Sequence, residues 1–320
     1  MLPSANHCKP GRILVTGGAG FIGSHTIDLL LHTGWQVIVL DNLFSGKIEN
    51  LPLHHPDLEF VHGDILEYPL VEDLLANCQA VLHLAAIVSV PYSIENPIYS
   101  FQVNTQGFLH VLQAIKKRQR SIRLVYASSA AVYGNVTSLP CCDEAPLSAP
   151  PLSPYALQKI QIEEYAHLYE QLFGIKSLGL RYFNAYGSRQ DANSPYSGVI
   201  SYFLDAYQND KELVLFGDGQ QSRDFIHVAD IAKANLLALQ SSYSGVLNVA
   251  TGQAQTLLNL IEYIESAGGK LTKQRREPSR HGDIKHSYAA IALAEKQMGF
   301  KYSLSLKQGI QQLLKDRHNP

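Results

Sequence analysis

Cysteine is scarce in this sequence, and its four cysteines show no spacing that a metal site requires. Cys141 and Cys142 are adjacent and cannot readily bridge each other, while Cys8 and Cys78 stand far from any other cysteine. We therefore expect free thiols, as in a reducing cytoplasm, and no metal centre.

Long apolar runs and an excess of positive charge are also missing. The longest apolar stretch, 81–90, is far shorter than the ~20 residues that cross a bilayer, and residues 1–12 lack the apolar core of a secretory signal. The 26 lysines and arginines are balanced by 28 acidic residues. We therefore expect a cytoplasmic protein that binds neither membrane nor nucleic acid.

Short apolar runs alternate with longer amphipathic segments between residues 12 and 181. The runs are almost continuously apolar, as strands buried on both faces must be. They predict strands at 13–15, 37–40, 58–61, 80–84, 122–127 and 175–180. Helices are predicted at 22–32, 71–76, 97–117 and 153–173. Because parallel neighbours require crossover connections, this order predicts a Rossmann-type, doubly wound parallel α/β sheet.

The alternation becomes irregular after Arg181. A loop at 184–198 precedes a predicted helix at 199–208. Strands at 225–228 and 246–249, with a helix at 229–239 between them, are expected to return to the main sheet. Two more helices are predicted near 257–266 and 289–298. The pattern predicts a large sheet domain with a smaller, discontinuous C-terminal domain.

Three glycines at three-residue intervals follow the first predicted strand. Gly17 permits a tight turn, Gly20 lets the backbone approach a pyrophosphate, and Gly23 lets the next helix pack on the sheet. Asp41 ends the second predicted strand, where ribose hydroxyls are bound, and its carboxylate would repel a 2′-phosphate. The pattern favours NAD over NADP, and a structural turn that binds nothing is the alternative.

Asp64 follows the third predicted strand. A carboxylate at this point can accept a hydrogen bond from the adenine amine, whereas an isolated Asp64 is more often a turn residue or helix N-cap. Its assignment to the cofactor therefore depends on the glycine turn.

A tyrosine and a lysine stand four residues apart near the start of the predicted helix 153–173. This spacing places Tyr155 and Lys159 on one helical face. The ammonium and a positive nicotinamide ring would stabilise the phenolate and lower the pKa of Tyr155 toward neutral. Ser128 and Ser129 follow a strand, at the sheet edge where chemistry occurs. The alternatives are a solvated helix face and hydroxyls that only cap a turn.

Together these segments resemble the extended short-chain dehydrogenase/reductase family, in its nucleotide-sugar epimerase branch. The resemblance covers nearly the whole chain and is carried by 16–23, 41–42, 64–65, 83–86, 128–134, 155–159, 181–184, 222–227 and 280–287. It implies that residues 1–181 with about 225–250 bind NAD, and that 182–224 with about 251–320 bind the nucleotide sugar. It also implies Tyr155 as catalytic base, Lys159 as ligand of the nicotinamide ribose, and Ser129 as partner of the reacting hydroxyl.

The resemblance assigns the remaining contacts residue by residue. NAD would contact Gly17, Gly20, Phe21, Ile22, Gly23, Asp41, Asn42, Asp64, Ile65, Leu84, Ala85, Ala86, Asn104, Tyr155 and Lys159. The UDP-sugar would contact Ser89, Ser129, Asn184, Gln190, Arg223, Arg280, Asp283 and Ser287. Arg223 and Arg280 would clamp the diphosphate, a task suited to guanidinium, although a surface ion pair is the commoner fate of arginine.

The reaction that the resemblance implies is 4-epimerisation of a UDP-hexose. Tyr155 would take the proton of the 4-hydroxyl while the hydride of carbon 4 passes to NAD, and the 4-keto sugar would regain it on its other face. Ala130 and Ala131 replace the acidic pair of related dehydratases, which disfavours dehydration. Ser287 is small where glucose-restricted relatives carry tyrosine. We therefore expect interconversion of UDP-N-acetylglucosamine and UDP-N-acetylgalactosamine, with some UDP-glucose activity.

Other readings stay open. Tyr92 and Gln158 replace an arginine and a serine of many relatives, which leaves the preferred sugar open. A UDP-glucuronate epimerase would need a cation, and the segment around Pro91 and Tyr92 offers none. A dehydratase or reductase, and a non-catalytic NAD sensor, are further alternatives, although a sensor would not need the Tyr155–Lys159 pair. The resemblance also implies a homodimer through 97–117 and 153–173, and a role in supplying polysaccharide or glycoconjugate precursors.

Overall fold

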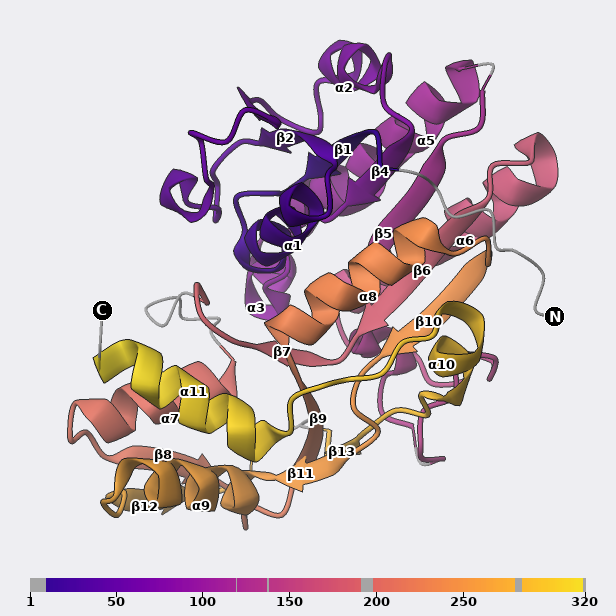
Figure 1. Ribbon diagram of the computed structural model, residues 1–320. Helices are drawn as coiled ribbons and strands as arrows, with labels where there is room; N and C mark the ends of the chain where they lie inside the picture. The colour runs from indigo at the N-terminus through magenta and orange to yellow at the C-terminus, as the bar shows by residue number, and fades with distance from the viewer. Residues whose placement is uncertain (1–9, 119, 137, 191–197, 280–283, 319–320) are drawn as a thin grey trace, which may run out of the picture.

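The chain forms a large layered part and a smaller part beside it (Figure 1). The computed structural model describes residues 10–118, 120–136, 138–190, 198–279 and 284–318. Residues from the middle and the end of the chain contribute to both parts, because β10 and α10 lie in the large part after the chain has built much of the smaller one.

Seven parallel strands form the central sheet, in the order β10-β6-β5-β4-β1-β2-β3. The strands are β1 (Arg12–Thr16), β2 (Gln36–Asp41), β3 (Leu58–His62), β4 (Ala80–His83), β5 (Arg123–Ser129), β6 (Ser177–Tyr182) and β10 (Gly245–Val249). The strand order reverses between β1 and β4, and such a reversal opens a crevice at the carboxyl ends of the strands. The predicted Rossmann-type sheet is confirmed.

Both faces of the sheet are covered by helices, because successive strand residues point to opposite faces. In β1, Ile13 and Val15 join one apolar cluster and Leu14 joins another. The first face packs against α1 (Phe21–His32), α8 (Val228–Gln240) and α10 (Ala292–Met298). The second face packs against α2 (Tyr68–Leu75), α5 (Gly107–Lys117) and α6 (Pro154–Phe173).

The predicted helix at 97–117 is present but is not uniform. It starts as α4 (Pro97–Phe101), continues through one π-helical turn, η2 (Gln102–Gln106), and ends as α5. A separate short helix, α3 (Val90–Glu95), precedes it, and single 3-10 turns lie at η1 (Ile48–Asn50) and η3 (Ala130–Tyr133). A π turn inserts one residue into the helical spacing, which sequence periodicity does not reveal.

The smaller part has its own apolar core. Its strands are β7 (Asn184–Tyr186), β8 (Leu213–Phe216), β9 (Ser222–His227), β11 (Ala254–Thr256), β12 (Gln274–Glu277) and β13 (His286–Ser287). Its helices are α7 (Val199–Gln208), α9 (Leu257–Gly268) and α11 (Leu306–His318). The three helices bury their apolar sides against one another and against β8. This core is separate from the two that cover the main sheet.

The expected return of 225–228 to the main sheet is wrong, whereas 246–249 joins it as β10. The misplaced segment is β9, which pairs with β7, β11 and β13 instead. Its apolar residues show that it is buried, but burial alone does not identify the neighbouring strand. Helix α11 was not predicted, although Leu306, Ile310, Leu313 and Leu314 carry helical spacing.

Candidate active site

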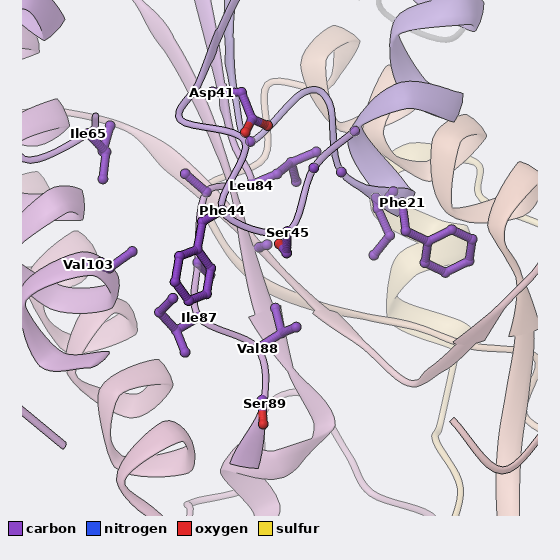
Figure 2. A pocket seen from close by; sticks show the side chains of 18 of the residues that line it. Phe21, Asp41, Phe44, Ser45, Ile65, Leu84, Ile87, Val88, Ser89 and Val103 are labelled. Atoms are coloured by element: carbon purple, nitrogen blue, oxygen red, sulfur yellow. The ribbon is translucent and has the colours of Figure 1, made fainter. Parts of the chain in front are cut away.

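A cavity of about 450 Å³ lies where the strand order of the main sheet reverses. Figure 2 shows side chains from the ends of several strands pointing into it. Most of the predicted cofactor and catalytic residues line this cavity. They are Gly17, Gly20, Phe21, Ile22, Gly23, Asp41, Asn42, Ile65, Leu84, Ala85, Ala86, Ser129, Tyr155 and Lys159.

The glycine turn forms a cradle that side chains would fill. Gly17 has a φ of 70°, and a Cβ there would lie 2.6 Å from the backbone nitrogen of Ala85. A Cβ on Gly23 would lie 2.4 Å from the Gly17 carbonyl oxygen. Gly20 lines the cavity, a Cβ there would lie 3.2 Å from the Gly17 carbonyl oxygen, and helix α1 begins at this point without a side-chain cap. Uncapped backbone N–H groups beside open space fit the pyrophosphate of a dinucleotide.

Asp41 lies at the end of β2, buried at the cavity wall. Its carboxylate accepts hydrogen bonds from the backbone N–H groups of Ala19 (2.9 Å) and Leu43 (2.8 Å). Burial raises the pKa of this carboxyl, while the two backbone hydrogen bonds lower it. The arrangement holds an acceptor where the ribose of a dinucleotide would lie, and so it fits NAD.

Asp64 lies outside the cavity lining, whereas its neighbour Ile65 is part of it. The Asp64 carboxylate accepts hydrogen bonds from the Asn42 side-chain amide (2.8 Å) and the Leu66 backbone N–H (2.9 Å). These are the contacts of a turn residue. They place Asn42 at the wall, and contact between Asp64 and the cofactor stays a prediction.

Asn104 stands behind the cavity rather than in its lining. It lies in the π turn η2, is 2% exposed, and forms two hydrogen bonds with the backbone of Ile87, at 2.7 and 3.0 Å. Its amide also donates to Gln158 Oε1 at 2.7 Å, and Ser100 Oγ donates to the same oxygen. Asn104 and Gln158 therefore fix the wall segment that contains Ile87.

The predicted catalytic residues meet at the end of β5 and the start of α6. Tyr155 and Lys159 lie on one helical face, as their spacing predicts, with the Lys159 Nζ 5.8 Å from the centre of the Tyr155 ring. The Tyr155 hydroxyl is hydrogen-bonded to Ser129. Ser129 also accepts from the backbone N–H of Ala131 at 3.2 Å, so it both caps the turn η3 and meets the tyrosine.

Burial and hydrogen bonding act in opposite directions on the pKa of Tyr155. Burial raises the pKa of Tyr155, and the hydrogen bond with Ser129 offsets this only in part. Burial also lowers the pKa of Lys159 to about 8, while the carboxylate of Glu163 raises it. The Lys159 ammonium donates to the Ala127 carbonyl at 2.7 Å. In the protein without bound NAD, burial therefore outweighs the hydrogen bond with Ser129 and the pKa of Tyr155 lies above its ordinary value. A lowering of this pKa by Lys159 and the nicotinamide ring together stays a prediction.

A buried ion pair lies beneath these residues. Arg181 donates through two nitrogens to the two carboxylate oxygens of Glu163, at 2.9 and 2.7 Å, and both side chains are at least 93% buried. Ser128 Oγ donates to the same carboxylate, and Arg181 donates to the Tyr133 hydroxyl at 2.9 Å. Ser128 is thereby held by the ion pair, which leaves Ser129 as the serine that meets Tyr155.

His83, at the end of β4, is a buried neutral histidine, and we expect it to make the fold acid-sensitive. Burial and the charge of Lys159 lower its pKa to about 3, and its Nδ1 lies 2.9 Å from Thr16 Oγ1. Below pH 6.5 the histidine binds a proton in the unfolded chain but stays neutral in the folded chain. The free energy of unfolding should therefore decrease by about 2 kcal/mol when the pH is lowered from 7 to 5. Urea unfolding at pH 7 and pH 5 measures this decrease. In His83→Asn the decrease should be smaller than in the unmodified protein by about 2 kcal/mol. His167→Asn, at an exposed position, should behave like the unmodified protein, and equal losses in all three would contradict the assignment.

The predicted substrate residues fall into three groups. Ser89 and Gln190 line the cavity. Asn184, Arg223 and Ser287 lie together on the small sheet, where Ser287 is paired with Arg223 and Asn184 with Phe225. Arg280 and Asp283 lie outside the described residues. Among the described residues no cluster of histidine, cysteine or acidic side chains could hold a metal ion, and no helix is long and apolar enough to span a membrane.

Several cavity residues were not predicted from the sequence. Phe44 and Lys47 follow β2, Tyr99 lies on α4, and Arg189 precedes Gln190. Arg189 has a φ of 62° and pairs with Asp28 at 2.8 Å. No motif marks these positions, but Phe44 and Lys47 directly follow the Asp41 that the glycine pattern identifies.

Comparison with known proteins agrees with this geometry. The profile of the NAD dependent epimerase/dehydratase family matches residues 13–250. The bifunctional UDP-glucose 4-epimerase and UDP-xylose 4-epimerase 3 of Arabidopsis thaliana is 33% identical, and the alignment covers 96% of this chain and 94% of that protein.

Two solved structures are similar over nearly the whole chain. The UDP-N-acetylglucosamine 4-epimerase of Methanobrevibacter ruminantium, in complex with UDP-N-acetylmuramic acid, has a TM-score of 0.91 and 38% identity, covering 96% of this chain and 98% of that one. The UDP-glucose 4-epimerase of Thermus thermophilus, in complex with NAD, has a TM-score of 0.86 and 35% identity, covering 96% and 99%.

Proposed function

Because the chain belongs to the NAD-dependent epimerase/dehydratase family, as an isomerase of nucleotide sugars that uses NAD, we propose that it interconverts UDP-N-acetylglucosamine and UDP-N-acetylgalactosamine. The observation that carries the reaction is the hydrogen bond between Tyr155 and Ser129 at the cavity wall. NAD, when bound, supplies a reversible acceptor for the hydride of carbon 4. The protein must then supply a proton acceptor, a partner for the 4-hydroxyl and an anchor for the UDP.

The residues divide these tasks as follows. Tyr155 Oη accepts the proton of the 4-hydroxyl and later returns it, and Ser129 Oγ holds that hydroxyl in line. Lys159, fixed by the Ala127 carbonyl, holds the nicotinamide ribose and adds positive charge beside the tyrosine. Arg223, on the small sheet, anchors the diphosphate.

The choice of sugar rests on Ser287. It lies on β13 directly beside Arg223, so a substrate held by that arginine lies close to it. A serine side chain leaves room for a 2-acetamido group that a tyrosine would exclude. A pocket with this room cannot strongly reject the smaller UDP-glucose, so we propose that sugar as a second, slower substrate.

The first experiment is an assay of the purified protein with UDP-N-acetylglucosamine and, separately, UDP-glucose, followed by proton NMR without added NAD. Formation of the galacto isomer mainly from the N-acetyl sugar would support the proposal. Conversion of UDP-glucose alone would remove the argument from Ser287 and keep the epimerase. No conversion of either sugar, even with added NAD, would defeat the assignment.

Enlarging Ser287 should shift this preference. In Ser287→Tyr we expect kcat/KM for UDP-N-acetylglucosamine to fall about tenfold or more relative to UDP-glucose, because the tyrosine occupies the acetamido space. Ser266→Tyr, at an exposed position on α9, is the matched control and should leave the ratio of kcat/KM for the two sugars unchanged. An unaltered ratio in Ser287→Tyr would show that the sugar is selected elsewhere.

UDP-glucuronate is a second candidate substrate because of one cation. Arg189 lines the cavity beside Gln190, so the structure offers a positive charge that the segment around Tyr92 does not. Its pairing with Asp28 offsets part of this charge. The NMR assay should therefore include UDP-glucuronate, and turnover of that sugar in preference to the others would displace our proposal.

We also propose that a second copy of the chain packs on α3, α4 and α6. These helices carry apolar side chains that are more than two-fifths exposed: Ile94, Ile98, Phe101, Leu157, Leu168, Leu172 and Phe173. Exposed apolar side chains gathered on neighbouring helices mark an interaction surface. Sedimentation of the purified protein tests this, and a monomer at micromolar concentration would contradict it.

A further inference from the structure

Three aromatic rings from different segments meet at the cavity. Phe44 comes from the loop after β2, Tyr92 from α3 and Tyr99 from α4, and all three line the cavity. The centre of the Phe44 ring lies 5.8 Å from that of Tyr92, edge to face, and 6.1 Å from that of Tyr99. Figure 2 shows the Phe44 ring in the cavity, among Ile65, Ile87 and Val103.

The loop that carries Phe44 is anchored on both sides of the ring. The backbone N–H of Phe44 donates to the Asn42 side chain at 3.0 Å, and that of Lys47 donates to the Ala19 carbonyl at 3.0 Å. Leu43, just before the ring, has a φ of 58°, a left-handed conformation that a leucine adopts only at a cost in free energy. A strained residue beside a binding cavity is held there by the contacts that surround it.

The position of Phe44 is unusual for a large apolar side chain. It is 55% exposed, whereas large apolar side chains are usually buried. The ring contacts two tyrosines, one on α3 and one on α4. The rings therefore connect the wall that follows β2 with the wall formed by α3 and α4.

We propose that Phe44, Tyr92 and Tyr99 form an aromatic latch over the cavity, and that this latch slows the release of NAD. A dinucleotide between the glycine turn and Asp41 leaves only after the contacts of Phe44 with the tyrosines open. This inference rests on the proposed function only in requiring bound NAD. Slow release suits an enzyme that returns its hydride to the same sugar, because the reduced cofactor must stay until the second transfer.

The test compares NAD release from two variants that each lose an exposed phenylalanine. Protein loaded with NAD is mixed with an excess of isotopically labelled NAD, and the label bound after desalting is followed by mass spectrometry. Phe44→Ala should release NAD about tenfold faster, because it loses two ring contacts. Phe173→Ala is the control, since Phe173 is 43% exposed, also packs edge to face on a tyrosine and lies away from the cavity. It should release NAD at the rate of the unmodified protein.

Turnover at saturating NAD separates the latch from other roles. Any loss of UDP-sugar turnover in Phe44→Ala should be repaired by saturating NAD, because the proposed role of the ring is to retain the cofactor. Equal release from Phe44→Ala and Phe173→Ala would overturn the latch, as would a turnover defect that excess NAD does not repair. If even the unmodified protein turned over no UDP-sugar, the proposed function would fail while the release comparison still decided the latch.

Discussion

Replacing Tyr155 by phenylalanine should lower kcat by about 10²- to 10⁴-fold, the usual contribution of a general acid–base group. The change removes one hydroxyl and keeps the ring, which is buried and lines the cavity at the start of α6. Ser129 would lose its partner and the 4-hydroxyl its proton acceptor. Initial rates with the best UDP-sugar, followed by NMR, measure the effect.

The decrease of kcat in Tyr155→Phe should come from the chemical step alone. The affinity for UDP should be unchanged in Tyr155→Phe, since the phenolic oxygen is not part of the small sheet that carries Arg223. Tyr165→Phe, a partly buried position on the same helix, is the matched control and should keep full activity. A kcat in Tyr155→Phe close to that of Tyr165→Phe would mean that another group takes the proton.

Replacing Glu163 by glutamine should destabilise the folded chain by about 3–5 kcal/mol, the cost of breaking a buried ion pair from one side. Although burial opposes its charge, the hydrogen bonds and the Glu163 carboxylate raise the pKa of Arg181, so Arg181 stays positive. Glutamine cannot neutralise that charge. Its amide has one accepting oxygen, whereas the carboxylate accepts a hydrogen bond from Arg181 at each of its two oxygens. Urea unfolding gives the free energy directly.

Two comparisons show whether the uncompensated charge is the cause. Glu59→Gln breaks the exposed pair with Arg12 and should cost less than about 1 kcal/mol. Glu163→Gln combined with Arg181→Met removes both charges and should recover part of the loss. If the double variant were less stable than Glu163→Gln alone, the loss would come from packing and not from charge.

The sequence alone indicates the fold because its strongest patterns are local. The apolar strands, the glycine turn and the Tyr155–Lys159 spacing each depend on residues close together in the chain. Local patterns place these groups at the carboxyl edge of one sheet, and the cavity is found there. The same patterns cannot show which strands pair, which is why β9 was assigned to the wrong sheet.

The contacts that shape the site join segments far apart in the chain, and periodicity does not reveal them. Asn104, which lies in a π turn, is hydrogen-bonded to the backbone of Ile87, and Phe44 contacts tyrosines about fifty residues away. The pKa of Tyr155 depends on burial, which composition does not predict residue by residue. Arg280 and Asp283, two of the predicted substrate residues, lie outside the described residues, so their roles stay predictions.

Strand β10 has a consequence for the order in which the molecule can be completed during synthesis. It pairs with β6, yet the chain between them builds much of the smaller part first. At a synthesis rate of about 5–20 residues per second, β6 therefore waits several seconds as an open edge of the growing sheet. An unpaired strand edge invites pairing with other chains. The nascent protein can thus pair wrongly with other chains once β6 has been made. The β6 edge is covered only when the five residues of β10, Gly245–Val249, have been synthesised and pair with it.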